Sequence, residues 1–222
     1  SMPLIIGITG SIATGKSVAS ETIAALGAVH CDADRIVHRL YDPGKPAFDR
    51  IVAIFGKEAV GEDGYIDRKI LGSKVFGKPG EMRKLTSAIG DIAVAVKSVV
   101  DEWNATLGQN DVALLEAVNL IEAGYGQWCH RVWLFACEDD LALKRLMERN
   151  QMSEEDAKQR LASQRKWQER EPAADLLLFN DGDLDDFRIR VEDEFTSTRG
   201  LWLSGELPPS RSYRWWEARF EG

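Results

Sequence analysis

Cysteine and histidine are both scarce in this sequence. There are only three of each among the 222 residues, and the odd number of cysteines shows no spacing typical of a zinc site. His30 and His130 each adjoin a cysteine, but adjacent residues of a strand point to opposite faces, so neither pair alone chelates a metal. We therefore expect free thiols, as in cytoplasmic proteins, and no zinc centre.

Long apolar runs and basic tracts are missing as well. No run approaches the roughly 18 residues that a membrane span needs, and we expect no signal peptide before the first strand. The net charge of −8 argues against a nucleic-acid partner. With 44% hydrophobic and 29% charged residues, the chain is typical of a globular protein. We expect a cytoplasmic monomer or small homo-oligomer without nucleic-acid or membrane partners.

What is present is a phosphate-loop pattern near the start of the chain. Residues 10–17 place two glycines, with four residues between them, before a lysine and a hydroxyl residue. The apolar run 4–9 predicts a buried strand before this loop, and the apolar spacing of 18–26 predicts a helix after it. Strand, loop and helix in this order favour nucleotide binding. The expected nucleotide contacts are Gly10, Ser11, Ile12, Ala13, Thr14, Gly15, Lys16, Ser17 and Val18.

The residue types in this loop suit ATP and Mg²⁺. Glycine allows backbone angles that turn successive N–H groups toward an anion, and the helix that follows adds its positive end. Lys16 is expected to reach the terminal phosphates, and the Ser17 hydroxyl to ligate the metal. The alternative is a glycine turn that precedes a helix by chance.

Carboxylates follow two further predicted strands. Residues 28–31 form the first of these strands, which leads into Asp32 and Asp34; the second, 111–116, ends in Glu116. The carboxyl edge of a parallel sheet is where such folds bind ligands. Asp32 or Asp34 is expected to act as a general base or as a magnesium partner through water, or else as a helix cap. Glu116 is a second candidate for the metal.

The remaining strands complete the predicted fold. Residues 131–136 and 174–179 are apolar runs, so we expect a five-stranded parallel sheet with helices on both faces, a three-layer α/β sandwich. Asn180 and Gly182 follow the last strand, where they either hold the nucleotide base or form only a turn. Glu122, soon after Glu116, is expected to cap a helix or line the site.

The expected layout is one domain of three parts: a core, a helical insertion and a helical lid. The core comprises about 1–42, 108–145 and 173–200. The insertion, about 43–107, ends in a helical stretch over about 79–103 and should form the acceptor pocket by analogy with other phosphate-loop folds. Arg68 lies in this insertion, where it is either an anion contact or a solvated surface arginine.

The lid, about 146–172, follows a helix over 139–149. That helix places Arg145 and Arg149 one turn apart, and we expect both to act on the phosphates. A second helix is predicted from Ser153 to just before Pro172. Its basic residues, which are interleaved with acidic ones, are expected to be solvated. They are Arg160, Arg165, Lys166 and Arg170.

These motifs together resemble the dephospho-CoA kinase family. The resemblance extends from about Ile5 to Phe195 and rests on several stretches in order along the chain. They are the phosphate loop with Gly7–Thr9 before it, Asp32-Ala33-Asp34, Phe55-Gly56, Gly64–Leu71, Val75-Phe76, Arg145 and Arg149 with Ser153–Gln164, and Ala174-Asp175 with Asn180 and Gly182.

The resemblance implies ATP-dependent phosphorylation of the ribose 3′-hydroxyl of dephospho-CoA, with Mg²⁺. It implies that Asp34 is the catalytic base and that Arg68 helps to bind dephospho-CoA. Glu122 matches the final acid of the family's acceptor segment. Lys16 and Ser17 would hold phosphate and metal, Arg145 and Arg149 would act from the lid, and Asn180 would lie near the adenine.

The sequence also departs from the family pattern. Ser11 and Ala13 stand where the family loop commonly has glycine, and these residues restrict the backbone angles that the loop can adopt. Gly90-Asp91 replaces a His-Pro pair, Val118–Glu122 keeps little of an acceptor segment, and Ala142 replaces a glutamine. Two alternatives therefore stand beside dephospho-CoA kinase: a related kinase of a nucleoside, nucleotide or other small molecule, and a homologue that binds nucleotide as a switch or scaffold.

Overall fold

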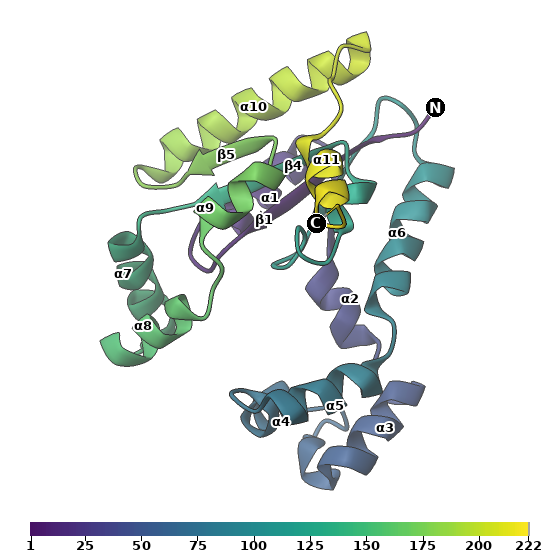
Figure 1. Ribbon diagram of the computed structural model, residues 1–222, viewed down its shortest axis with the longest axis vertical. Helices are drawn as coiled ribbons and strands as arrows, with labels where there is room; N and C mark the ends of the chain where they lie inside the picture. The colour runs from purple at the N-terminus through teal and green to yellow at the C-terminus, as the bar shows by residue number, and fades with distance from the viewer. Residues whose placement is uncertain (222) are drawn as a thin grey trace. The chain divides into compact units, whose positions relative to one another are not determined.

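The computed structural model describes residues 1–221, which form two compact units. One comprises residues 1–32 together with the chain from residue 100 onward, and the other comprises 33–99. The five strands of the described chain all lie in the first unit (Figure 1). They are β1 (Leu4–Gly10), β2 (Val29–Asp32), β3 (Val112–Glu116), β4 (Arg131–Ala136) and β5 (Leu176–Phe179).

The strands pair in parallel in the order β2-β3-β1-β4-β5. The predicted five-stranded parallel α/β sheet is confirmed. The chain leaves β1 toward β2 on one side and leaves β3 toward β4 on the other. In open α/β sheets a ligand crevice lies where connections diverge in this way, outside the carboxyl ends of the strands. The loop that follows β1 therefore begins at the expected binding edge.

Side chains alternate between the two faces of the sheet. Leu4, Ile6 and Ile8 of β1 point to the face covered by α1 (Lys16–Ala25) and α10 (Leu184–Ser204), whose Ile23, Phe187 and Val191 join the same core. On the other face, a side chain at Gly7 would collide with Leu120 and Cys129. The segment after β3 thus packs directly on the central strand, and the small residue at position 7 makes room for it.

The other helices of this unit differ from the expected pattern in one place. Helices α7 (Asp139–Asn150) and α8 (Glu154–Ala162) lie side by side (Figure 1). The single helix expected from Ser153 to just before Pro172 is wrong, because α8 ends at Ala162 and α9 (Trp167–Arg170) is a separate short turn. The intervening segment 163–166 contacts the phosphate loop instead, which no local sequence signal indicated.

The chain continues beyond β5 and α10 into a C-terminal helix, α11 (Arg211–Ala218). The Asp175 carboxylate, just before β5, accepts hydrogen bonds from Ser210 Oγ at 2.6 Å and from the Arg211 N–H at 2.8 Å. Helix α11 packs against two short 3₁₀ turns, η2 (Tyr125–Trp128) and η3 (Glu171–Ala173). This tail therefore fastens both the segment after β3 and the segment before β5.

The second unit is helical. It contains α2 (Ala33–Arg39), α3 (Pro46–Phe55), η1 (Lys57–Ala59), α4 (Arg68–Val75), α5 (Pro79–Ile89) and the first part of α6 (Ile92–Thr106). The helical stretch expected over about 79–103 consists of two helices, because Gly90 adopts φ 96° between α5 and α6 and ends α5. The hydrophobic core of this second unit includes Ile51, Phe55 and Leu71. No helix within residues 1–221 combines the length and apolar character that a bilayer crossing requires.

Candidate active site

The phosphate loop joins β1 to α1 through an unusual backbone path. Gly15 caps the N-terminus of α1 at φ 90°, and a side chain there would collide with the Asn180 amide. A Cβ at Gly10 would lie 2.6 Å from the Phe135 carbonyl oxygen. Ala13 also adopts a left-handed conformation, at φ 65°. The loop thus takes the tightly curved form that turns N–H groups toward an anion, and only glycine fits at its two ends, Gly10 and Gly15.

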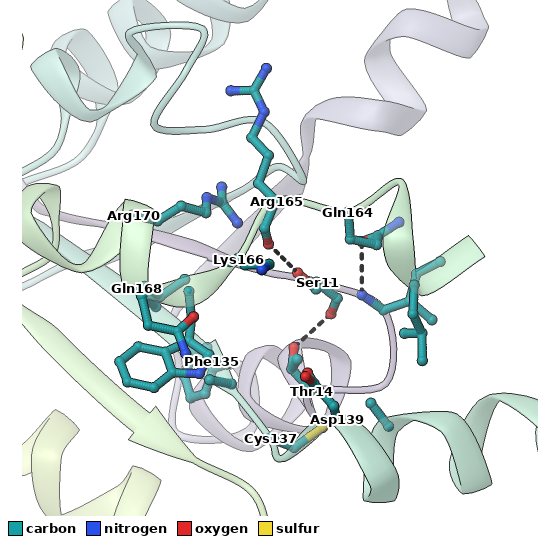
Figure 2. A pocket seen from close by; sticks show the side chains of 16 residues that line it. Ser11, Thr14, Phe135, Cys137, Asp139, Gln164, Arg165, Lys166, Gln168 and Arg170 are labelled. Carbon is teal, nitrogen blue, oxygen red and sulfur yellow. Dashed lines mark hydrogen bonds between the residues drawn. The ribbon is translucent and has the colours of Figure 1, made fainter. Parts of the chain in front are cut away.

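Hydrogen bonds hold the tip of this loop (Figure 2). Thr14 Oγ1 donates to the Ser11 carbonyl oxygen at 2.7 Å, and Ser11 Oγ donates to the Arg165 carbonyl oxygen at 3.1 Å. The Ile12 N–H donates to Gln164 Oε1 at 3.2 Å. An amide oxygen is a weaker acceptor than a phosphate oxygen, so a nucleotide phosphate can replace Gln164 at this N–H. In the sequence, only the family resemblance points to Gln164.

A pocket of about 150 Å³ lies beside the loop. Figure 2 shows that Ser11 and Thr14 line it together with Arg170 and Gln168 from the region of α9. Its volume is below the roughly 300 Å³ at which ligand pockets begin. The pocket is therefore too small for a whole nucleotide.

Arg145 connects the loop to the end of β5. Its Nη1 donates to the Asn180 carbonyl oxygen at 2.6 Å and to the Ala13 carbonyl oxygen at 3.3 Å. The structure therefore brings together three of the predicted nucleotide contacts from three distant segments. Arg149, one turn further along α7, is exposed, and so is Gly182 after β5.

Glu116 and Asp32 end neighbouring strands and are register partners in the β2–β3 pairing. Glu116 Oε1 accepts hydrogen bonds from Ser20 Oγ at 2.6 Å and from His30 Nε2 at 3.2 Å. Burial raises the pKa of Glu116, but these two hydrogen bonds and the charge of Lys16 outweigh it and hold the pKa below its ordinary value. Glu116 is therefore a carboxylate at neutral pH, and it lies within the electrostatic reach of Lys16.

The donor set at this edge has the chemistry that Mg²⁺ prefers. Ser17, at the start of α1, offers a hydroxyl oxygen, and Asp32 and Glu116 offer carboxylate oxygens. No cluster of three or more His, Cys, Asp or Glu side chains suited to a metal occurs within residues 1–221. Magnesium in kinases is held by one or two protein groups, water and substrate phosphates, so the residues present fit such an ion.

Glu122 lies after β3 and is held by two arginines. Its Oε1 accepts a hydrogen bond from Arg170 Nε at 2.8 Å, and its Oε2 lies 3.2 Å from Arg165 Nη1. The prediction that Arg170 is solvated is wrong, because this residue is only 4% exposed. The pattern of alternating charges that suggested a solvated face says nothing about a partner 48 positions away.

In the helical unit, Asp34 occupies the first turn of α2 and is half-buried. Arg68 is the first residue of α4, which Asp67 caps by accepting hydrogen bonds from the N–H groups of Lys69 and Ile70. A pocket of about 350 Å³ within this unit is lined mainly by basic and aromatic residues, among them Arg68. The other lining residues are Arg35, His38, Arg39, Tyr41, Tyr65, Ile66 and two carboxylates, Asp42 and Asp63. Arg68 Nη1 lies 2.6 Å from His38 Nδ1.

Comparisons with known proteins agree with one another. A family model described as dephospho-CoA kinase matches residues 4–186. A dephospho-CoA kinase from Geobacillus kaustophilus is 36% identical over 190 residues, which cover 86% of this chain and 94% of that protein. One from Symbiobacterium thermophilum is 35% identical over 197 residues, which cover 88% and 82%. The solved dephospho-CoA kinase from Campylobacter jejuni aligns with a TM-score of 0.60 at 28% identity and covers 89% of this chain and 98% of that one.

Proposed function

The chain belongs to the dephospho-CoA kinase family, so it is a kinase that phosphorylates dephospho-CoA with ATP, and we propose which of its residues carry out each part of the reaction. The observation that carries this proposal is the phosphate loop. The loop has a curved backbone and Lys16, and it lies where the connections of the sheet diverge to opposite sides. These features suit a nucleoside triphosphate.

On the nucleotide side, the N–H groups of the loop and the N-terminus of α1 bind the β- and γ-phosphates. Lys16 neutralises the charge that develops on the transferred group. Arg145 keeps Ala13 and Asn180 together, so it links the loop to the segment that meets the base. Ser17, Asp32 and Glu116 would hold Mg²⁺, directly or through water, and this ion would supply further neutralisation of phosphate charge.

On the acceptor side, Asp34 accepts the proton of the ribose 3′-hydroxyl as that oxygen attacks the γ-phosphorus and the bond from this phosphorus to the β–γ bridging oxygen breaks to release ADP. Asp34 follows the carboxyl end of β2 by two residues, which is the sheet edge where ligands bind. The basic and aromatic pocket around Arg68 suits the phosphates and the ring systems of dephospho-CoA. Glu122 supports the acceptor from the segment after β3.

We propose that the protein is located in the cytoplasm.

The direct test is formation of coenzyme A from ATP and dephospho-CoA, detected by mass spectrometry. Asp34→Asn should lower kcat by about a hundredfold or more because the variant lacks the proton acceptor. Asp49→Asn, an exposed carboxylate in the first turn of α3, is the matched control and should act as wild type. Faster turnover of a nucleoside than of dephospho-CoA, or tight ATP binding without any product, would contradict the assignment.

A further inference from the structure

Arg170 is a buried cation that the phosphoryl-transfer account leaves without a role. Its side chain is 5% exposed, and burial together with the charge of Arg165 lowers its pKa to about 10. It is therefore still protonated at neutral pH. A charge with this little access to water requires several partners of opposite polarity.

Those partners lie on β1 and on the segment that follows β3. Arg170 Nη2 donates to Thr9 Oγ1 at 2.8 Å and to the Val118 carbonyl oxygen at 2.9 Å. Thr9 Oγ1 in turn donates to the same Val118 oxygen at 3.0 Å. Arg170 Nε binds Glu122 at 2.8 Å. The planar guanidinium thus joins the end of β1, just before the phosphate loop, to the segment that follows β3.

The same network reaches the tip of the loop. Glu122 also pairs with Arg165 at 3.2 Å, and the Arg165 carbonyl oxygen accepts a hydrogen bond from Ser11. Figure 2 shows Arg165 and Arg170 extending from neighbouring parts of the same segment beside the loop. Two arginines on one segment therefore fix the Glu122 carboxylate relative to the nucleotide-binding backbone.

We infer that Arg170 is a positioning residue that fixes Glu122 and the segment 118–122 for binding of the acceptor, an inference that rests on the proposed role of Glu122. Arg170 acts through Glu122 and through the Val118 carbonyl. Its loss should therefore weaken binding of the acceptor while binding of ATP is kept.

The test compares Arg170→Met, Arg170→Lys and Glu122→Gln with wild type. For each we would measure kcat, the KM of both substrates, the melting temperature, and the Kd of dephospho-CoA by calorimetry without ATP. Arg170→Met should raise the KM and Kd of dephospho-CoA about tenfold and change the KM of ATP less than twofold. Arg170→Lys keeps a charge beside Glu122 and should return both values to within about threefold of wild type. Arg160→Met, an exposed arginine of α8, is the matched control.

A double variant separates positioning from general support of the fold. If Arg170 acts through Glu122, then Arg170→Met combined with Glu122→Gln should cost no more acceptor affinity than the larger of the two single changes. The inference is overturned if Arg170→Met lowers only the melting temperature, if both substrates weaken equally, or if the two losses add. Should Arg170→Met not fold, unchanged acceptor affinity in Glu122→Gln overturns it. Absence of coenzyme A formation by wild type, with acceptor affinity still dependent on Arg170, would instead contradict the proposed function.

Discussion

Glu116 and Glu122 lie six positions apart around the end of β3, yet they have different surroundings. Their side chains are similarly buried, at 13% and 15% exposure. Glu116 accepts hydrogen bonds from a serine and a histidine, whereas Glu122 binds two guanidinium groups. A carboxylate with weakly charged partners keeps its negative potential for a metal ion, and a carboxylate between two arginines is neutralised. Equal burial therefore does not imply equal roles.

The largest expected effect is on stability at Glu122. Glu122→Ala leaves Arg170 as a buried charge without its carboxylate, and breaking such a pair lowers the free energy of unfolding by about 3 kcal/mol. Urea unfolding would measure this change. Glu116→Ala should cost only about 1 kcal/mol, since it leaves only a serine and a histidine without their acceptor. Equal losses at the two sites would remove the contrast between them.

The second effect is on catalysis at Glu116. Glu116→Gln keeps the shape of the side chain but removes its charge, so kcat should fall about tenfold and more Mg²⁺ should be needed for half-maximal rate. The measurement is a magnesium titration of the initial rate. Glu148→Gln, an exposed carboxylate on α7, is the control and should leave both values unchanged. An unchanged magnesium requirement in Glu116→Gln would argue against its role at the metal.

The third effect is the pH dependence of stability. Burial raises the pKa of Glu116, but the hydrogen bonds from His30 and Ser20 and the charge of Lys16 lower it further. Near pH 4 the unfolded chain thus binds more protons than the folded one. The contribution of Glu116 to the free energy of unfolding is therefore complete above the ordinary pKa of glutamate, and it is lost as the pH falls through the lowered pKa of the folded state. The stability difference between wild type and Glu116→Gln should shrink from pH 7 to pH 3, as followed by urea unfolding.

The smallest effect concerns the loop beside Glu116. Ala13 has φ 65°, which costs a residue with a side chain about 1–2 kcal/mol. Glycine removes this cost but adds freedom to the unfolded chain, so Ala13→Gly should stabilise the protein by about 0.5 kcal/mol. Ala24→Gly, within α1, should destabilise it. Because the variant keeps the Ala13 carbonyl that Arg145 and Cys137 contact, a loss of stability in Ala13→Gly would show that the left-handed conformation of Ala13 costs less than the entropy that glycine adds to the unfolded chain.

Most of the sheet and the phosphate loop could be predicted because their signals are local. Four of the five strands, all except β2, are mainly short apolar runs, and the loop is a contiguous pattern of residues whose backbone freedom decides the conformation. Helix boundaries were less predictable. Gly90 divides the expected helical stretch over about 79–103 into two helices, and nothing between Ala162 and Trp167 signals the end of α8.

The buried arginine network could not be predicted, since its partners are far apart in sequence. Arg170 meets Thr9 across 161 positions and Glu122 across 48. Alternating charge in the neighbouring residues favoured a solvated side chain, and that reasoning considers only one helix face. The position of Arg170 became evident only when segments from β1, β3 and α9 were placed together.

The sequence by itself determined the class of sheet, the anion-binding loop and the family, because short-range backbone preferences and contiguous motifs encode all three. Tertiary structure alone decided which carboxylate keeps its charge available and which is neutralised by arginine. The physical reason is that burial and charge pairing depend on groups brought together from distant segments, and residue order does not reveal those distances.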